Sequence, residues 1–349
     1  MSRRYLIVRT DRLGDVLLTT PVSRAIRQNE PDAHISWLVR SYAAPLLQNN
    51  PDVDQIIVDS EGSVRELIER LKREHFDVAI IAFPRWRVTW VLWRAGIPVR
   101  IGPASKLYSA LFTKRIFQHR SEGKKHEADY NLELLEPLGM PFQRLPTRYE
   151  VTSEERAWAR HTLEGLRISF RKPLVALHPG SGGSSARWPL TSFMELGDRL
   201  QEMDCDVIVT AGPGEVYQSI MIDNMRRIPS FIAAGSITIR QLAALFSGVN
   251  LVVTNSTGPL HLAVAVGTPT VSVFSPLPTC HPKRWGPYPS YAEGKNEHAV
   301  VLAPDHGLPL AEMSAVSVED VLKLCQKQLG IISGRPACRQ AGSTVDASR

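Results

Sequence analysis

The chain has 349 residues, of which 43% are hydrophobic and 22% charged, and its formal net charge at pH 7 is +6. This length predicts two domains of ordinary size, and the composition excludes an intrinsically disordered chain. The excess of Lys and Arg suits anionic partners such as nucleotides, phosphorylated glycolipids, acidic membrane surfaces or nucleic acid, although charge alone is better explained by a solubilising surface.

The cysteines are widely scattered, and no pair has the spacing of a metal site or a redox motif. We therefore expect reduced thiols in a cytoplasmic protein. No run approaches the roughly 20 apolar residues of a membrane span. The N-terminus lacks the features of a signal peptide, so we expect a soluble protein whose contact with any membrane would be peripheral.

Short apolar runs alternate with helix-like segments along the first half of the chain. The expected strands are residues 5–8, 34–39, 55–58 and 77–82, and the expected helices are residues 15–29, 43–49 and 62–74. This alternation predicts a parallel sheet covered by helices.

The same pattern restarts after a proline-spaced stretch at residues 137–148. The expected strands are residues 173–177, 206–211, 231–233, 251–254 and 270–274, and the expected helices are residues 190–202, 215–225, 239–246, 259–266 and 317–329. We predict an α/β protein with two Rossmann-like, doubly wound domains facing a cleft, with ligands at the carboxyl ends of the strands. The predicted domains span residues 1–148 and 149–333, followed by a disordered tail at residues 334–349.

The stretch RTDRLGDVLLTTP (residues 9–21) follows the first predicted strand directly. Arginines, a glycine and two aspartates at a strand end suit a polar ligand. Either Asp11 or Asp15 could act as a general base, and Asp15 is favoured because Gly14 frees the backbone beside it.

Three strand-to-helix turns of the second half are suited to phosphate or ribose. In HPGSGGSSARWP (residues 178–189), Ser181 and Gly182 offer backbone N–H groups and a hydroxyl, and Arg187 offers charge. The alternative is a flexible loop of small residues. The Gly-Lys-Ser/Thr ending of a nucleoside-triphosphatase loop is missing.

The second turn, TNSTGPLHLA (residues 254–263), places Ser256, Thr257 and Gly258 at a helix start, with His261 on the first turn. A lone histidine is more often structural, but these neighbours favour a phosphate contact. In the third turn, AGPGE (residues 211–215), Glu215 could accept from ribose hydroxyls or merely complement a helix dipole. Together the three turns predict a nucleotide-diphosphate site.

These motifs carry a resemblance to a known family. RLGDVLLTTP, HPGSGGSSARWP, TNSTGPLHLAVAVGTPTVSVF (residues 254–274) and KKHEADYNLELLEPLG (residues 124–139) are similar in order and spacing to segments of the lipopolysaccharide heptosyltransferases, glycosyltransferase family 9. The resemblance covers roughly residues 4–329.

The resemblance implies a GT-B-type fold and an inverting, metal-independent transfer that needs no cofactor. It implies that Asp15 is the general base, that Thr257, Gly258 and His261 contact the donor diphosphate, and that Glu215 contacts the ribose. The chain departs from the family pattern at Ala186, where many members have Lys, and at Ser256, where some have Asp. Arg187 is the candidate to replace the missing lysine charge.

Basic residues gather in the first half of the chain. We expect the acceptor to be bound by Arg9, Arg12, Arg85, Arg120 and Lys124. In RWRVTWVLWR (residues 85–94), three tryptophans share a helical face, which fits either a core-facing helix or a surface resting on anionic lipid.

Two Asp-x-Asp pairs, at residues 52–54 and 204–206, imitate a metal site of other glycosyltransferases. Each precedes an apolar strand, where turn aspartates are common, so we interpret both as structural and expect no metal.

We therefore expect a monomeric glycosyltransferase, and the resemblance implies that it moves heptose from ADP-heptose, the family's commonest donor, to a lipopolysaccharide-core-type acceptor. A nucleotide-sugar epimerase of similar fold is the first alternative. A non-catalytic nucleotide-sugar-binding protein is the second, and we expect no nucleic-acid partner because no such motif is present.

Overall fold

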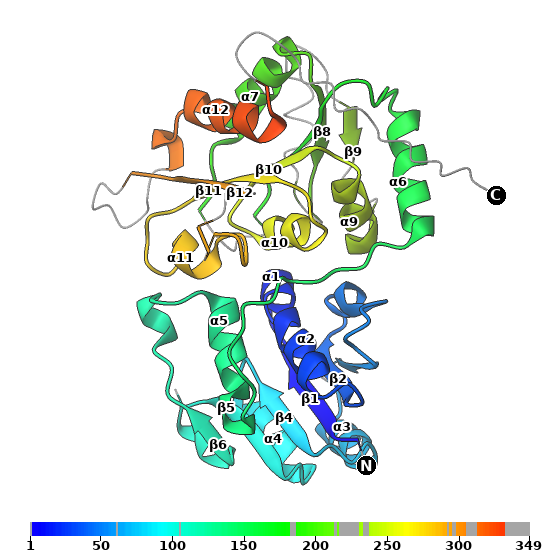
Figure 1. Ribbon diagram of the computed structural model, residues 1–349, viewed down its shortest axis with the longest axis vertical. Helices are drawn as coiled ribbons and strands as arrows, with labels where there is room; N and C mark the ends of the chain where they lie inside the picture. Colours follow the sequence, from blue (N-terminus) through cyan, green and yellow to red (C-terminus); the bar gives the residue numbers. More distant parts are fainter. Residues whose placement is uncertain are drawn as a thin grey trace, which may run out of the picture.

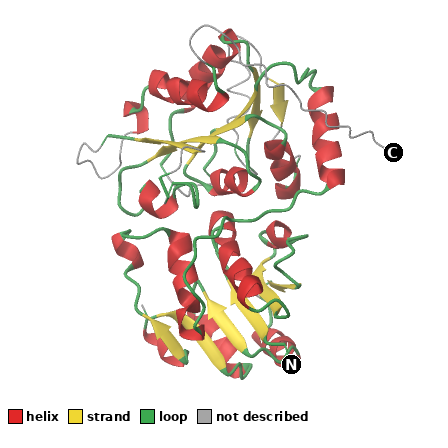
Figure 2. Cartoon of the chain, in the orientation of Figure 1, coloured by secondary structure: helices red, strands yellow, loops and turns green. Residues whose placement is uncertain are grey.

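The computed structural model describes residues 2–60, 62–104, 106–181, 186–212, 215, 230–232, 237–291, 293–294, 298–304 and 313–331. Two lobes lie one above the other, each built on a six-stranded sheet with helices on both faces (Figures 1 and 2). Every strand pairing in both sheets is parallel. The predicted pair of doubly wound α/β lobes is thus confirmed.

The N-terminal lobe has the strand order β3-β2-β1-β4-β5-β6. Its strands are β1 (Arg4–Val8), β2 (His34–Arg40), β3 (Gln55–Asp59), β4 (Val78–Ile81), β5 (Val99–Pro103) and β6 (Lys114–Ile116). Its helices are α1 (Leu13–Leu17), α2 (Thr20–Asn29), η1 (Ala44–Leu47), α3 (Val64–Arg73), α4 (Trp86–Arg94), η2 (Leu107–Leu111), η3 (Arg120–Glu122), α5 (Glu127–Leu132) and η4 (Glu133–Leu138).

The C-terminal lobe has the strand order β12-β11-β10-β7-β8-β9. Its strands are β7 (Leu174–His178), β8 (Asp206–Thr210), β9 (Ser230–Ile232), β10 (Leu251–Asn255), β11 (Thr270–Phe274) and β12 (His298–Leu302). Its helices are α6 (Ser153–Gly165), α7 (Leu190–Glu202), α9 (Ile239–Ser247), α10 (Gly258–Ala265), α11 (Pro282–Trp285), η5 (Met313–Ala315) and α12 (Val318–Leu329).

Alternation along the central strands explains why helices cover both faces. In β1, Tyr5 and Ile7 join the core under α2, whereas Leu6 and Val8 join the core under α3 and α4. Successive side chains of a strand point to opposite faces, so a strand that is apolar throughout must be covered on both sides. Among the described residues, every helix is too short or too polar to cross a bilayer.

Most expected elements lie within two residues of the observed ones, but some predictions were wrong. Residues 15–29 form two helices and not one. The first ends at Leu17, and the second begins at Thr20 with Pro21 in its first turn. Residues 43–49 form only the short η1. Strands β5, β6 and β12 were not predicted. The predicted helix at 215–225, apart from Glu215, and the tail at 334–349 lie outside the described residues.

Two of the three tryptophans of α4, Trp86 and Trp93, are exposed, so the core-facing interpretation was wrong for them. Trp90 is half-buried and packs against the core. The helix buries Val88, Thr89, Val91 and Leu92. These smaller side chains fit beneath the helix against the sheet, which leaves the rings of Trp86 and Trp93 outside.

The two lobes touch where α1 meets α10, as Figure 1 shows. A Cβ atom on Gly14 would lie 2.6 Å from Cδ2 of His261, and one on Gly258 would lie 3.5 Å from Cβ of Leu13. Glycine at position 14 is therefore required by the close approach of a helix from the other lobe.

Further contacts join the lobes on both sides of this point. On one side Arg240 of α9 donates to Glu155 of α6 and to the carbonyl oxygen of Pro45 at 3.0 Å. On the other, His126 Nε2 lies 2.9 Å from the carbonyl oxygen of Gly286. Helix α6, which follows the predicted boundary at residue 148, packs on α9. The boundary itself stays a prediction.

We expect Gly14→Ala to destabilise the protein, because the added methyl group overlaps His261. Overpacking of this kind costs roughly 1–3 kcal/mol. In a His261→Ala background the same change should cost much less, since the ring that it meets is gone. Thermal and urea unfolding of the four proteins would measure this coupling, and equal costs in both backgrounds would contradict the contact.

Candidate active site

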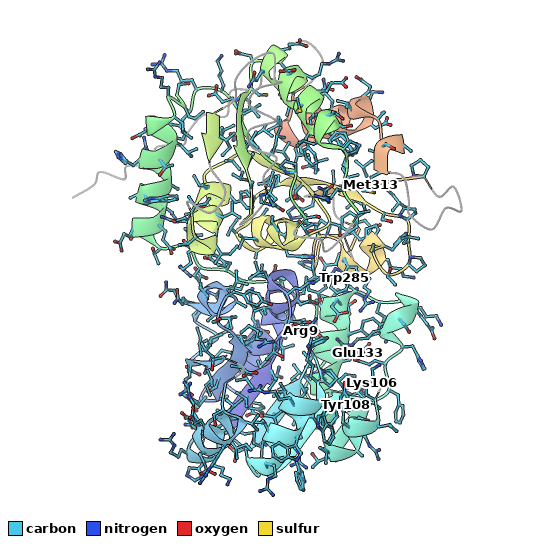
Figure 3. All side chains as sticks on the ribbon, turned by 180° about the vertical axis from the view of Figure 1, so that it is seen from behind. Arg9, Lys106, Tyr108, Glu133, Trp285 and Met313 are labelled. Atoms are coloured by element: carbon cyan, nitrogen blue, oxygen red, sulfur yellow. The ribbon has the colours of Figure 1, made fainter. Side chains whose placement is uncertain are left out.

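A pocket of about 560 Å³ opens at the carboxyl ends of β1, β4 and β5. The C-terminal lobe contributes Arg284 and Trp285 of α11 to its wall, and Figure 3 shows Arg9 and Trp285 on either side of the boundary between the lobes. Its charged lining residues are Arg9, Asp11, Arg12, Asp15, Arg40, Arg85, Lys106, Arg120, Glu127 and Arg284. All the charged residues of the first predicted motif therefore line one cavity.

Arg9 is the central cation of this pocket, although only 2% of it is exposed. Its Nε donates to Asp11 at 2.7 Å, one terminal nitrogen donates to Asp15, and the other donates to Glu127 at 3.2 Å. A buried guanidinium costs free energy unless it is paired, and these carboxylates supply the pairing. Arg9 therefore fixes the positions of both aspartates.

Glu127 accepts hydrogen bonds from guanidinium groups of both lobes. Its Oε1 accepts from Arg9 at 3.2 Å and from Arg120 at 2.7 Å, and its Oε2 accepts from Arg284 at 3.1 Å. Burial favours the protonated acid, but the positive charges of Arg120, Arg9 and Arg284 outweigh it and hold the pKa of Glu127 at about 2. Glu127 is thus a permanent carboxylate that ties α5 to α11.

Asp15 has the electrostatics of a base that works near neutral pH. Burial, together with the negative charges of Asp11 and Glu127, raises the pKa of Asp15 to about 6 against the lowering effect of Arg9. A carboxylate with this pKa is ionised at pH 7 and still accepts a proton readily. Perturbed groups in a cavity are candidates for a functional role.

Asp11 shares the pocket and also bonds to Arg9. Burial raises the pKa of Asp11 as well, against the attraction of Arg9. Its backbone carbonyl accepts from the Tyr42 hydroxyl at 2.5 Å. The geometry thus places both sequence candidates for the base on one guanidinium, and the choice of Asp15 stays a prediction.

The five predicted acceptor residues differ in burial and in whether they line this pocket. Arg12 and Arg85 are exposed in the pocket. Arg9 and Arg120 line it too, but both are largely buried in ion pairs with its carboxylates. Lys124 lies outside it, lines a second cavity on the other side of α5, and pairs with Glu122 at 2.5 Å.

The predicted donor residues lie at the carboxyl ends of β7, β8 and β10 in the facing lobe. Glu215 is buried and accepts from the backbone N–H of Gly212 at 2.6 Å. A Cβ atom on Gly180 would lie 1.8 Å from that carboxylate, so the glycine makes room for it. Ser181, the residue after Gly180, is buried, and Arg187 is exposed. Gly182 lies outside the described residues.

The start of α10 faces the N-terminal lobe. Thr257 is the N-cap, Gly258 is the first helical residue, and Ser256 before them is half-buried. His261 is 5% exposed, and its buried Nδ1 has no hydrogen-bond partner among the described residues. Burial lowers the pKa of His261 to about 3, with His126 adding to the effect, so the ring is neutral and offers at most one N–H.

Sequence reasoning missed three residues of this region. Glu127 stood within a quoted motif but carried no distinguishing signal, and Arg284 lies far away in the sequence. Asn255 links two donor turns, since its Oδ1 accepts from the Trp188 N–H at 2.9 Å and its Nδ2 donates to the Pro179 carbonyl at 2.8 Å. Only the fold brings these partners together.

Three of the four aspartates of the Asp-x-Asp pairs lie in turns or bends and have partners there, whereas Asp206 begins β8. Asp54 accepts from the backbone N–H of Ile35 at 2.7 Å, and Asp52 accepts from Arg148 at 3.3 Å. Asp204 pairs with Lys172 at 2.5 Å. Among the residues that the structure describes, no group of three or more His, Cys, Asp or Glu side chains is placed to hold a metal ion.

Comparison with known proteins identifies the family to which this fold belongs. Residues 64–300 match the model of glycosyltransferase family 9 (heptosyltransferase). A candidate glycosyltransferase of Haemophilus influenzae is 30% identical over 81% of this chain and 86% of its own length. Lipopolysaccharide heptosyltransferase 3 of Escherichia coli is 28% identical over 75% of this chain and 79% of its own.

The solved structures agree on the fold. The ADP-heptose lipopolysaccharide heptosyltransferase II of E. coli superposes with a TM-score of 0.78 at 19% identity, over 93% of this chain and 98% of that one. The protein is therefore a glycosyltransferase with a GT-B-type fold. More particularly, the chain belongs to glycosyltransferase family 9, the heptosyltransferases. Membership of a glycosyltransferase family favours glycosyl transfer over the epimerase alternative.

We expect Glu127→Gln to lower the pKa of Asp15 from about 6, because it removes a negative charge that raises this pKa and leaves Arg9 more available to Asp15. Carboxyl-carbon NMR titration of aspartate-labelled protein would measure the change, with Asp15→Asn assigning the resonance.

The matched control is Glu133→Gln, which changes another carboxylate of the same region that pairs with Lys125 outside this pocket. It should leave the Asp15 titration where it is. An unchanged or higher pKa of Asp15 in Glu127→Gln would contradict the proposed electrostatic coupling between Glu127 and Asp15.

Proposed function

We propose that this protein transfers heptose from ADP-heptose to a lipopolysaccharide-core-type acceptor, with inversion at the sugar and without a metal ion. The observation that carries the proposal is the Asp15 carboxylate, held by buried Arg9 in a pocket between the lobes with its pKa raised to about 6. The relatives support the substrates, since they are named for heptosyl transfer to lipopolysaccharide and for ADP-heptose.

In this mechanism Asp15 accepts the proton of the acceptor hydroxyl as that oxygen forms its bond to the anomeric carbon. The bond from that carbon to the diphosphate breaks on the opposite face, and the leaving diphosphate keeps the electron pair. Arg9 keeps the carboxylate pointed into the pocket. Without Arg9, burial would favour the protonated acid, which cannot act as a base.

The departing diphosphate would lie at the start of α10. Backbone N–H groups at Thr257 and Gly258 and the positive end of the helix dipole favour an anion there. The neutral His261 adds a single N–H, so the loop and helix amides provide most of the stabilisation. Glu215 would accept from the ribose, and Ser181, Gly182, Arg187 and Ser256 would complete the donor site.

The acceptor would enter from the N-terminal lobe. Arg12 and Arg85 are exposed cations of the pocket and would contact acceptor phosphates, with Lys124 farther along the lobe. Arg9 and Arg120 would act through the carboxylates they pair with. The setting we propose is the cytoplasmic face of the inner membrane, with the protein acting as a monomer.

We expect Asp15→Asn to reduce heptosyl transfer by about 10²- to 10⁴-fold, the usual contribution of a general base, while the affinity for donor stays nearly constant. Radiolabelled transfer assays and calorimetry with ADP-heptose would measure the two quantities. The amide has the shape of the carboxylate but cannot accept the proton.

The matched variant is Asp11→Asn, which changes the other carboxylate on Arg9. A large loss in that variant with little loss in Asp15→Asn would reassign the base. A thermal-shift panel of ADP-, UDP- and GDP-sugars tests the donor separately, because a ligand that binds the folded state raises Tm. Stabilisation by UDP- or GDP-sugars alone would refute ADP-heptose.

We expect transfer to continue in excess EDTA at its full rate, because helix dipole, amides and arginine charge would stabilise the leaving diphosphate in place of a metal ion. Assays before and after chelation would measure this. Activity that vanishes with EDTA and returns with magnesium or manganese would contradict it.

A further inference from the structure

One part of the N-terminal lobe is basic by composition. Residues 78–121 contain no Asp or Glu and eight Lys or Arg residues. This stretch runs from β4 through α4, β5 and η2 to β6 and η3. Any carboxylate that neutralises it must come from elsewhere in the fold.

The fold supplies carboxylates to only some of these cations. Arg87 pairs with Asp59 at 2.7 Å and Arg120 pairs with Glu127 at 2.7 Å. Five other cations are exposed, and within the described ranges they have no ion-pair partner: Arg85, Arg94, Lys106, Lys114 and Arg115. They leave a positive potential over one side of the lobe.

Large apolar side chains protrude among these cations. Leu107 is 98% exposed, Phe117 is 81% exposed and Trp86 is 60% exposed. Single exposed apolar residues are ordinary, but three that follow three neighbouring strands are not scattered. Trp86 comes after β4, Leu107 after β5 and Phe117 after β6, and parallel strands bring their carboxyl ends to one edge of the sheet.

Specific contacts hold these three segments together. The rings of Trp86 and Tyr108 lie 6.4 Å apart, and the Tyr108 hydroxyl donates to the Pro84 carbonyl at 2.9 Å. The backbone N–H of Ala104 donates to the carbonyl of Ile116 at 2.8 Å. These contacts hold in place the three segments from which the apolar side chains protrude.

This edge is continuous with the candidate active site. Arg85, Lys106 and Tyr108 line the pocket that holds Asp15, and Leu107 lies between two of them in the sequence. Figure 3 shows Lys106 and Tyr108 on the N-terminal lobe, below Arg9 and Trp285 in this view. Whatever covers the protruding residues also lies at the pocket mouth.

We propose that Trp86, Leu107 and Phe117, together with Arg85, Lys106, Lys114 and Arg115, form a docking surface for an anionic lipid bilayer. The apolar side chains would enter the interfacial region, and the cations would contact lipid phosphates. A bilayer fits better than a folded partner, because the side chains protrude singly between cations and do not line a groove.

The proposal rests on the proposed function in one respect: a lipid-anchored acceptor would reach the pocket from the surface on which the protein lies. Docking of this kind keeps the pocket mouth against the membrane. The acceptor then needs only to rise from the headgroup layer, without leaving the bilayer.

The test is sedimentation with vesicles of phosphatidylethanolamine and phosphatidylglycerol (7:3) and with vesicles of phosphatidylcholine alone, at 0.1 M salt. We expect the protein to bind the anionic vesicles at least ten-fold more tightly. Leu107→Ser/Phe117→Ser should weaken that binding at least ten-fold. Lys114→Ser/Arg115→Ser should also weaken binding to the anionic vesicles. It should reduce the salt dependence of that binding, because salt screens surface charges, beyond about 10 Å at 0.1 M, and this variant has two fewer of them.

The matched control is Phe170→Ser/Arg171→Ser, which removes an exposed ring and a cation from the C-terminal lobe. It should bind like the parent. Tm and circular dichroism should be equal in all variants, since the side chains changed are exposed. No preference of the parent for anionic vesicles would overturn the proposal, as would parent-like binding by both surface variants. A change of oligomeric state in these variants, with vesicle binding intact, would assign the surface to a protein contact instead.

Vesicle binding needs neither donor nor acceptor, so it is independent of the outcome for Asp15→Asn. Transfer assays separate the two further. With a water-soluble acceptor fragment the surface variants should match the parent, whereas with acceptor embedded in vesicles they should be slower.

Discussion

The buried guanidinium of Arg9 is the constraint on which the rest of the site depends. A cation at this depth is tolerated only with carboxylates around it, and those carboxylates come from α1, from the turn before it and from α5. Burial of Arg9 thus requires the motif after β1 and the start of α5 to converge. The same convergence brings a potential base to the boundary between the lobes, so the fold and the chemistry share one electrostatic cause.

The parts of the fold that the sequence predicted are those with local causes. Apolar strands such as β1 and β10, and the helix α12 capped by Ser317, are specified by residues near one another in the chain. The missed strands β5, β6 and β12 are short or flanked by polar residues, and pairing with a neighbouring strand stabilises them. Their hydrophobic pattern alone was too weak to predict them.

The residues of the candidate site also differ in whether local sequence could predict their positions. Asp15, Thr257 and Glu215 each follow a strand, so topology alone brings them to the proper sheet edges. The acceptor-binding role of Arg9 stays a prediction, but its burial could not be predicted, because the ion pair that Arg9 forms with Glu127 joins residues 118 positions apart in the chain. Glu127 and Arg284 could not be paired from sequence for the same reason.

The contact of Arg284 with Glu127 has a consequence for the charge balance of the pocket. With the lobes together, three guanidiniums (Arg9, Arg120 and Arg284) face three carboxylates (Asp11, Asp15 and Glu127), and this largely buried set is electrically neutral. Arg284 belongs to the other lobe, so a separation of the lobes would leave one negative charge in excess. Glu127 would then lose one of the three cations that hold its pKa at about 2, and only Arg9 and Arg120 of its own lobe would remain. Apposition of the lobes therefore completes the neutralisation of this buried carboxylate, so the charge balance of the site is itself a contact between the lobes.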